Sequence, residues 1–312
     1  MKNDTPTTFV IFGVTGALSK RKLIPALLDL YAKHALPKDF RMVGFSRGSF
    51  NTEEFRKFIR ETVEAKIPQY ASELVTSFAE RAYHCQGTFE DKEAYVRIAQ
   101  TLADIDEKEI KQCSNKLFYL AVSPSSYAVI FDHLASSGLT IPCGGERVLP
   151  SGALAKEGWT RVLVEKPFGK DLETAQELER RLSALFQEEQ IFRIDHYLAK
   201  ETVQNILAFR FSNILFEHLW SNQFIERVEI NLHEKFGIEG RGAFYDGVGA
   251  LRDVGQNHVL QMLALIAMED PKELDAVAIR KERARALASL RLPEQGDEQS
   301  HPRGQYRGNK EE

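Results

Sequence analysis

The chain has 312 residues and a formal net charge of −4, with 41 Lys and Arg against 45 Asp and Glu. The length predicts about two domains. The near balance of charge argues against nucleic-acid binding, which needs a strong positive field. No run of about 18 apolar residues occurs, so we expect no membrane span. The opening MKNDTPTTF lacks a basic segment before an apolar core, so we expect no signal peptide.

The three cysteines, Cys85, Cys113 and Cys143, are odd in number and widely spaced. They form neither a CxxC pair nor a cluster with metal-ligand spacing, so we expect no metal site. We therefore predict reduced, mostly buried thiols, and from this use of cysteine we expect a cytoplasmic location.

The first half of the chain alternates short apolar runs with helical patterns. Runs that predict buried strands lie at residues 9–12, 42–45, 117–122 and 162–164. Helical patterns lie at residues 23–31, 90–104 and 171–188. Strands that alternate with helices form a parallel sheet with crossover helices. We therefore predict a doubly wound α/β domain over residues 1–193.

The pattern changes after this point. Residues 227–232 alternate polar and apolar side chains, which predicts a strand of an antiparallel sheet with one buried face. A glycine-rich stretch follows at 237–249, and the apolar segment 259–268 predicts a buried helix. We therefore predict an α+β domain over residues 194–312. Its last part, 293–312, has no Val, Ile, Leu, Phe or Met and is predicted to be disordered.

A glycine turn joins the first predicted strand to the first helix. Glycine lets the backbone approach a pyrophosphate, and the free N–H groups at the helix start point toward it. The turn contains Gly13, Thr15 and Gly16, which make GxxG rather than the full GxGxxG fingerprint. Lys20 adds positive charge just beyond it. The same glycines could also serve only to connect a strand to a helix.

Arg47 lies at the end of the second predicted strand, where a Rossmann-like dinucleotide-binding domain holds the adenosine ribose. An acidic residue here favours NAD, whereas an arginine accommodates a 2′-phosphate and favours NADP. We therefore predict an NADP-binding domain, although an arginine in a surface loop is also common.

Four segments go beyond composition, namely EKPFG (165–169), RIDHYLAKE (193–201), GIEGRGAFYD (237–246) and RDVGQNH (252–258). Together with the glycine turn, and in this order and spacing, they resemble the glucose-6-phosphate dehydrogenase family. The resemblance runs from about residue 8 to residue 307. It implies NADP-dependent oxidation of D-glucose 6-phosphate at C1 to 6-phospho-D-glucono-1,5-lactone, the first step of the oxidative pentose phosphate pathway.

The resemblance also implies a role for individual residues. It makes His258 the base for the C1 hydroxyl proton, with Asp195 as its partner, and it puts Lys166 against both sugar and cofactor. The substrate phosphate would be held by His196, Tyr197 and Lys200. Hydrogen bonds from sugar hydroxyls would be accepted by Glu234 and Asp253.

Elementary chemistry agrees with these roles. Oxidation of a hydroxyl requires a base for the proton and a cofactor for the hydride. Histidine suits the first task near neutral pH, and a carboxylate can orient its ring. Each residue also has a plainer interpretation when it is taken alone. His258 could be a core or cap histidine, Asp195 a helix N-cap, and Lys166 a surface charge.

The chain departs from the family pattern in three places. Ala17 stands where the family usually has Asp, which removes an acid that complements the helix dipole. Ala199 replaces a Gly, which is harmless if the position is helical. Family members continue well past the RGQY segment at 303–306, so we expect the second domain to be truncated. For a full-length member the resemblance implies a homodimer or homotetramer.

Two other interpretations stay open. The chain could be a non-catalytic remnant that binds NADP or a partner without turnover. It could also be a sugar oxidoreductase of the glucose–fructose oxidoreductase type, which carries an EKP motif after its dinucleotide domain. The RIDHYLAKE block at 193–201 argues against the latter.

Overall fold

The computed structural model describes residues 5–143, 158–169, 171–233, 237 and 242–291. The chain divides into an N-terminal unit, Met1–Ile194, and a C-terminal unit, Asp195–Glu312. The division lies one residue from the boundary that the sequence predicts. Among the described residues, no helix is both long and apolar enough to cross a bilayer.

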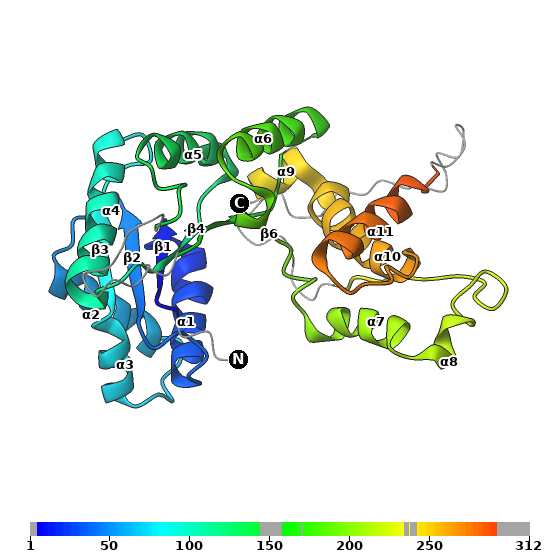
Figure 1. Cartoon of the computed structure of the whole chain (residues 1–312), viewed down its shortest axis with the longest axis horizontal. Helices are drawn as coiled ribbons and strands as arrows, with labels where there is room; N and C mark the ends of the chain where they lie inside the picture. Colours follow the sequence, from blue (N-terminus) through cyan, green and yellow to red (C-terminus); the bar gives the residue numbers. More distant parts are fainter. Residues whose placement is uncertain (1–4, 144–157, 170, 234–236, 238–241, 292–312) are drawn as a thin grey trace, which may run out of the picture. The chain divides into compact units, whose positions relative to one another are not determined.

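The N-terminal unit is built on a six-stranded parallel sheet of order β3-β2-β1-β4-β5-β6 (Figure 1). The strands are β1 (Thr7–Phe12), β2 (Phe40–Ser46), β3 (Ala82–Gln86), β4 (Asn115–Leu120), β5 (Thr160–Glu165) and β6 (Ile191–Ile194). This order confirms the predicted doubly wound, Rossmann-like α/β fold. The four predicted strands are β1, β2, β4 and β5, whereas the prediction missed β3 and β6.

Helices cover both faces of this sheet. They are α1 (Ile24–Ala32), α2 (Thr52–Glu64), α3 (Ser72–Ala79), α4 (Lys92–Asp104), α5 (Tyr127–Ser136) and α6 (Leu172–Leu185). Shorter helical turns are η1 (Ser19–Leu23), η2 (Ile105–Ile110), η3 (Pro124–Ser126) and η4 (Glu188–Gln190). Val10 and Phe12 of β1 pack with α4, α5 and α6, whereas Ile11 packs with α1, α2 and α3. Successive side chains thus enter opposite cores, as strands buried on both faces require.

Two of the three cysteines form a disulfide, so the prediction of reduced thiols is wrong for them. Cys113 precedes β4, and Cys143 follows α5. Their Cα atoms lie 5.8 Å apart, within the range that a disulfide needs. The backbone N–H of Gly158, before β5, donates to the Cys143 carbonyl. The pairing therefore depends on how the chain returns to the sheet, which cysteine spacing does not reveal. Cys85 is a buried free thiol, as predicted.

All regular elements in the described part of the C-terminal unit are helices. Its elements are α7 (Glu201–Phe211), α8 (Ile214–Glu217), α9 (Gly242–Ala250), the π-helical segment η5 (Leu251–Val259), α10 (Leu260–Ala267) and α11 (Ala276–Ala288). Helix α10 confirms the predicted buried helix at 259–268. Residues 227–232 have no regular structure, so the predicted antiparallel strand is not found. The physical reason is that a strand needs a partner to pair with, and the described residues of this unit contain none. The predicted disorder at 293–312 lies outside the described residues.

Candidate active site

The glycine turn has the tight geometry that a phosphate loop needs. Gly13 has φ +76°, and a Cβ atom there would lie 2.7 Å from the Ala121 carbonyl oxygen. The Gly16 N–H donates to the Gly13 carbonyl at 2.9 Å, and the Ser19 hydroxyl donates to the same oxygen. Thr15 is partly exposed beside this turn. Only glycine has both the conformational freedom and the size for position 13.

The turn leads directly into helical structure. The Lys20 N–H donates to the Gly16 carbonyl at 3.0 Å, so the first helical hydrogen bond begins within the turn. The Lys20 side chain is exposed in η1. Ala17 is also exposed, so its methyl group fills no core position. This arrangement offers backbone N–H groups and positive charge to an anion.

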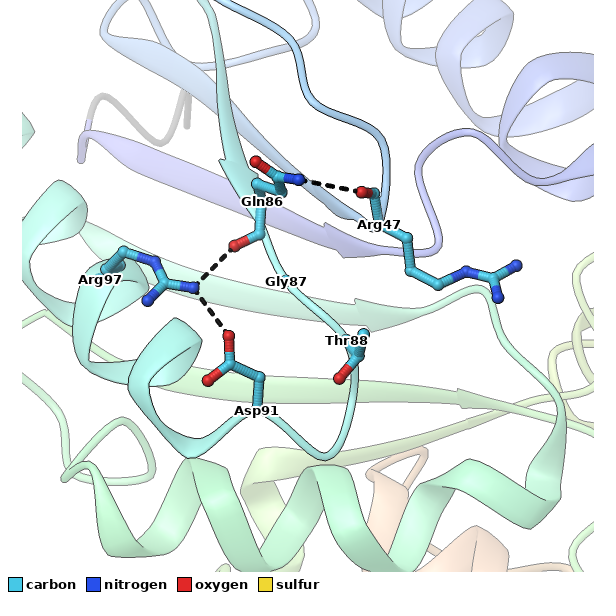
Figure 2. A pocket seen from close by; sticks show the side chains of 6 residues that line it. All are labelled: Arg47, Gln86, Gly87, Thr88, Asp91 and Arg97. Carbon is cyan, nitrogen blue, oxygen red and sulfur yellow. Dashed lines mark hydrogen bonds and ion pairs between the residues drawn. The ribbon is translucent and has the colours of Figure 1, made fainter.

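Arg47 lines a pocket at the carboxyl ends of β2 and β3 (Figure 2). Its carbonyl accepts a hydrogen bond from the Gln86 side chain at 3.3 Å, while its guanidinium extends away from that contact. On the opposite wall Arg97 donates to the Gln86 carbonyl and pairs with Asp91 at 2.8 Å. Asp91 also caps α4 by accepting from two backbone N–H groups. Arg97 is therefore engaged within the protein, whereas no hydrogen bond is found for the Arg47 guanidinium among the described residues.

The sequence missed most of this pocket. Its lining residues are Arg47, Gln86, Gly87, Thr88, Asp91 and Arg97. All but the first lie on β3, in the loop after it, or on α4. Prediction of β3 would have placed them next to Arg47, because β2 and β3 are paired and parallel.

Lys166 follows β5, and its neighbour Glu165 is held firmly. The Tyr119 hydroxyl donates to the Glu165 carboxylate, and the Tyr127 hydroxyl donates to the Glu165 carbonyl at 2.9 Å. Burial raises the pKa of Tyr127 to about 12, so this hydroxyl stays protonated and can donate. The Lys166–Pro167 peptide bond is cis, and the Lys166 side chain is partly exposed. The strand end thus presents Lys166 from a fixed backbone.

In the C-terminal unit the structure brings Asp195 and His258 together. His258 Nδ1 lies 2.6 Å from Asp195 Oδ1, although the residues are 63 positions apart. The His258 side chain is 2% exposed and the Asp195 side chain 12%. The same Oδ1 accepts the Tyr197 N–H at 2.9 Å, so Asp195 also organises the turn before α7. An ionised carboxylate can only accept, so the contact puts the proton on Nδ1 and leaves Nε2 as the basic nitrogen.

Three further predicted residues gather around this pair. The rings of His196 and Tyr197 have their centroids 4.6 Å and 4.3 Å from that of His258. Lys200 Nζ lies 3.7 Å from the centroid of the Tyr197 ring. Imidazole, phenol and ammonium groups can all donate hydrogen bonds to a phosphate, and Lys200 adds positive charge. The cluster can therefore hold an anion beside the His258–Asp195 pair.

The remaining predicted residues are placed less fully. Asp253 is partly buried in η5, the segment that also carries His258. Glu234 lies outside the described residues. Asp195, His196 and His258 each offer one potential metal-ligand atom within 4.8 Å of the others. The absence of a resident metal stays a prediction.

Comparisons with known proteins identify the family of both units. Residues 10–205 match the family model for the glucose-6-phosphate dehydrogenase NAD binding domain, and residues 207–312 match the model for its C-terminal domain. The glucose-6-phosphate 1-dehydrogenase 2 of Mycobacterium tuberculosis is 42% identical over 303 residues, which cover 96% of this chain and 56% of the relative. The glucose-6-phosphate 1-dehydrogenase of Borreliella burgdorferi is 39% identical over 311 residues, which cover 99% of this chain and 60% of the relative.

Solved structures give the same result. A glucose-6-phosphate dehydrogenase in complex with its substrate glucose-6-phosphate matches with TM-score 0.78 and 34% identity, covering 91% of this chain and 56% of that one. Glucose-6-phosphate 1-dehydrogenase from Mycobacterium avium matches with TM-score 0.80 and 34% identity, and the match covers 98% of this chain and 62% of that one. The chain thus spans little more than half the length of these relatives.

Proposed function

Because the chain belongs to the glucose-6-phosphate dehydrogenase family, we propose that it oxidises D-glucose 6-phosphate at C1 to 6-phospho-D-glucono-1,5-lactone with NADP. The observation that carries this proposal is the hydrogen bond between the buried His258 and the partly buried Asp195. A histidine oriented in this way is a base ready to accept a hydroxyl proton. The corresponding place in metabolism is the first step of the oxidative pentose phosphate pathway.

The proton chemistry follows from the pair. The neutral His258 ring accepts the C1 hydroxyl proton at Nε2 and becomes an imidazolium. Asp195, which already accepts from Nδ1, stabilises the positive charge that develops. Burial strengthens this attraction, because little water screens it. NADP, when bound, supplies the acceptor for the C1 hydride.

The N-terminal unit fits a dinucleotide. The approach of Gly13 to Ala121 leaves no space for a side chain, as in a turn that admits a pyrophosphate to the backbone. Lys20 and Arg47 supply exposed positive charge near the ends of β1 and β2. Thr15 and Gly16 complete the turn, and Lys166 would contact both cofactor and sugar. Arg47 supports a preference for NADP, since it matches the 2′-phosphate in charge.

The phosphate of the substrate would bind among His196, Tyr197 and Lys200. Their rings and charge lie around His258, so a phosphate held there keeps the sugar close to the base. Asp253 would accept from the sugar hydroxyls, as would Glu234 by family resemblance. A homodimer or homotetramer and a cytoplasmic location stay predictions. The Cys113–Cys143 disulfide removes the support that reduced thiols gave to the latter.

The test is NADPH formation by the purified chain, followed by absorbance with NADP and glucose 6-phosphate. His258→Ala should lower turnover by roughly 10²–10⁴-fold and keep NADP affinity, because a general base contributes about that much. His218→Ala is the matched control, since His218 is an exposed histidine of the same unit. An unchanged rate in His258→Ala removes His258 from the mechanism. NADP binding without turnover in the wild type identifies a non-catalytic remnant, and activity on unphosphorylated glucose identifies the other oxidoreductase type.

A further inference from the structure

Helix α11 carries a partly buried positive charge that the proposed mechanism does not use. Arg283 is partly buried, and its Nε atom is buried without a hydrogen-bond partner among the described residues. Arginine is rarely placed in this way, because its desolvation is costly unless an opposite charge is near. A neighbouring anion is therefore the natural explanation for this side chain.

The packing of α11 directs Arg283 toward the His258–Asp195 pair. Ile279 and Ala286 lie one turn before and after Arg283 on the same helical face. Both belong to a cluster that contains Leu198, which directly follows the Asp195–Tyr197 turn. The Arg283 guanidinium also donates to the Gln261 side chain, and Gln261 lies three residues after His258. The charge is thus held against the two segments that supply the pair.

The charges that act on Arg283 identify its negatively charged partner. Burial lowers the pKa of Arg283 below its ordinary value, attraction to Asp195 raises it, and repulsion from Arg280 lowers it. Arginine nevertheless stays charged at neutral pH, since its ordinary pKa is so high. Asp195 is therefore the negative charge that attracts the Arg283 guanidinium.

We propose that Arg283 is a positioning residue whose positive charge opposes protonation of His258, so that the His258 ring is ready to act as a base. The proposal rests on the proposed function, in which His258 accepts the proton. Other charged or titratable groups on the elements around the pair are His196, Tyr197, Lys200, Asp253, Arg280, Glu282 and Arg285. Glu282 and Arg285 pair with each other at 2.9 Å.

The sign of the effect follows from charge alone. A positive charge near the pair stabilises the Asp195 carboxylate and opposes formation of the His258 imidazolium. Loss of that charge makes the imidazolium easier to form, so His258 protonates at higher pH. For a partly buried charge at this range, the shift is on the order of one pH unit.

The test follows the His258 ring by NMR across a pH titration of the full chain, with the signal assigned by its loss in His258→Ala. Arg283→Gln should move the His258 titration midpoint to higher pH by about one unit. Arg283→Lys, which keeps the charge, should restore the wild-type midpoint. Lys281→Gln is the matched control, since it removes an exposed positive charge from the same helix and should change nothing. In preparations that reduce NADP, the acid limb of kcat/KM should move in the same direction as the midpoint.

The outcomes separate the two proposals. An unchanged midpoint in folded Arg283→Gln overturns the role of Arg283. If that variant does not fold, Arg283→Met decides, because it also removes the positive charge, keeps an unbranched side chain, and should raise the midpoint as well. An unchanged midpoint in folded Arg283→Met then overturns the role. A shifted midpoint in a chain that never reduces NADP supports the coupling between Arg283 and the pair while it refutes the proposed function.

Discussion

Gly13→Ala should damage both the stability and the cofactor site of the N-terminal unit. Alanine in a left-handed conformation costs roughly 1 kcal/mol or more, and Gly13 has φ +76°. The added Cβ would also meet the Ala121 carbonyl oxygen at 2.7 Å and Val122 Cγ1 at 3.0 Å. The carbonyl cannot yield easily, because the Ala121 N–H is bonded to Phe12 at 3.1 Å. We therefore expect the free energy of unfolding to fall by about 2–3 kcal/mol.

Gly138→Ala is a matched control for this experiment. Gly138 has φ +73°, almost the same as Gly13, but a Cβ atom there meets no other atom within 4 Å. It therefore carries the conformational cost alone, about 1 kcal/mol. Urea denaturation of both variants separates the two contributions. A titration with NADP then shows whether the contact also displaces the turn, in which case only Gly13→Ala loses affinity.

Equal losses of stability in the two variants, with equal NADP affinity, would refute this reasoning. That result would mean that the chain near Ala121 relaxes without cost. The glycine would then be explained by its backbone conformation alone, and the close approach to the strand end would play no part in nucleotide binding.

Two other properties of the N-terminal unit can be measured in the same way. Arg47→Ala should weaken the binding of NADP at least tenfold more than the binding of NAD, because it removes a charge-assisted contact worth about 1.5–3 kcal/mol. Equal losses of affinity for the two cofactors in calorimetry would exclude Arg47 from the 2′-phosphate site. Burial lowers the pKa of His84 below its ordinary 6.5, so the His84 ring binds a proton more readily in the unfolded chain than in the folded one. The free energy of unfolding therefore falls as the pH drops through about 6.5. Thermal unfolding at pH 7.5 and 5.5 should therefore depend less on pH in His84→Gln than in the wild type, and an identical dependence would count against the buried site.

The central part of the sheet could be predicted from sequence, whereas its edges could not. The four predicted strands are the inner strands of the observed order, and the two missed strands, β3 and β6, are its edges. An inner strand of a doubly wound sheet is covered on both faces and therefore reads as a continuous apolar run. In β3 only Ala82 and Cys85 are buried, and in β6 Phe192 is 43% exposed. Half-covered strands of four or five residues lack a pattern that distinguishes them from loops.

Tertiary contacts explain the two wrong predictions. Cys113 and Cys143 are 30 residues apart and meet only because α5 returns the chain to the start of β4. No local pattern contains that path. Residues 227–232 alternate in the manner of a strand, but alternation indicates only a half-buried surface. A strand also requires a neighbour, and the described residues of the C-terminal unit offer none.

In the candidate site, too, the features formed by neighbouring residues could be predicted from local sequence, whereas those formed by distant residues could not. The glycine turn is local, because strand, turn and helix follow one another within about fifteen residues. The His258–Asp195 pair is not, and family resemblance rather than chemistry suggested it from sequence. The structure supplies the missing physical link, since the Tyr197 N–H fixes the same Asp195 oxygen that binds His258. Arg283 had no motif at all. The role of a single charge on an ordinary helix depends on the partly buried carboxylate that packing brings near it. Electrostatic support of an active site is therefore the part that sequence reasoning is least able to find.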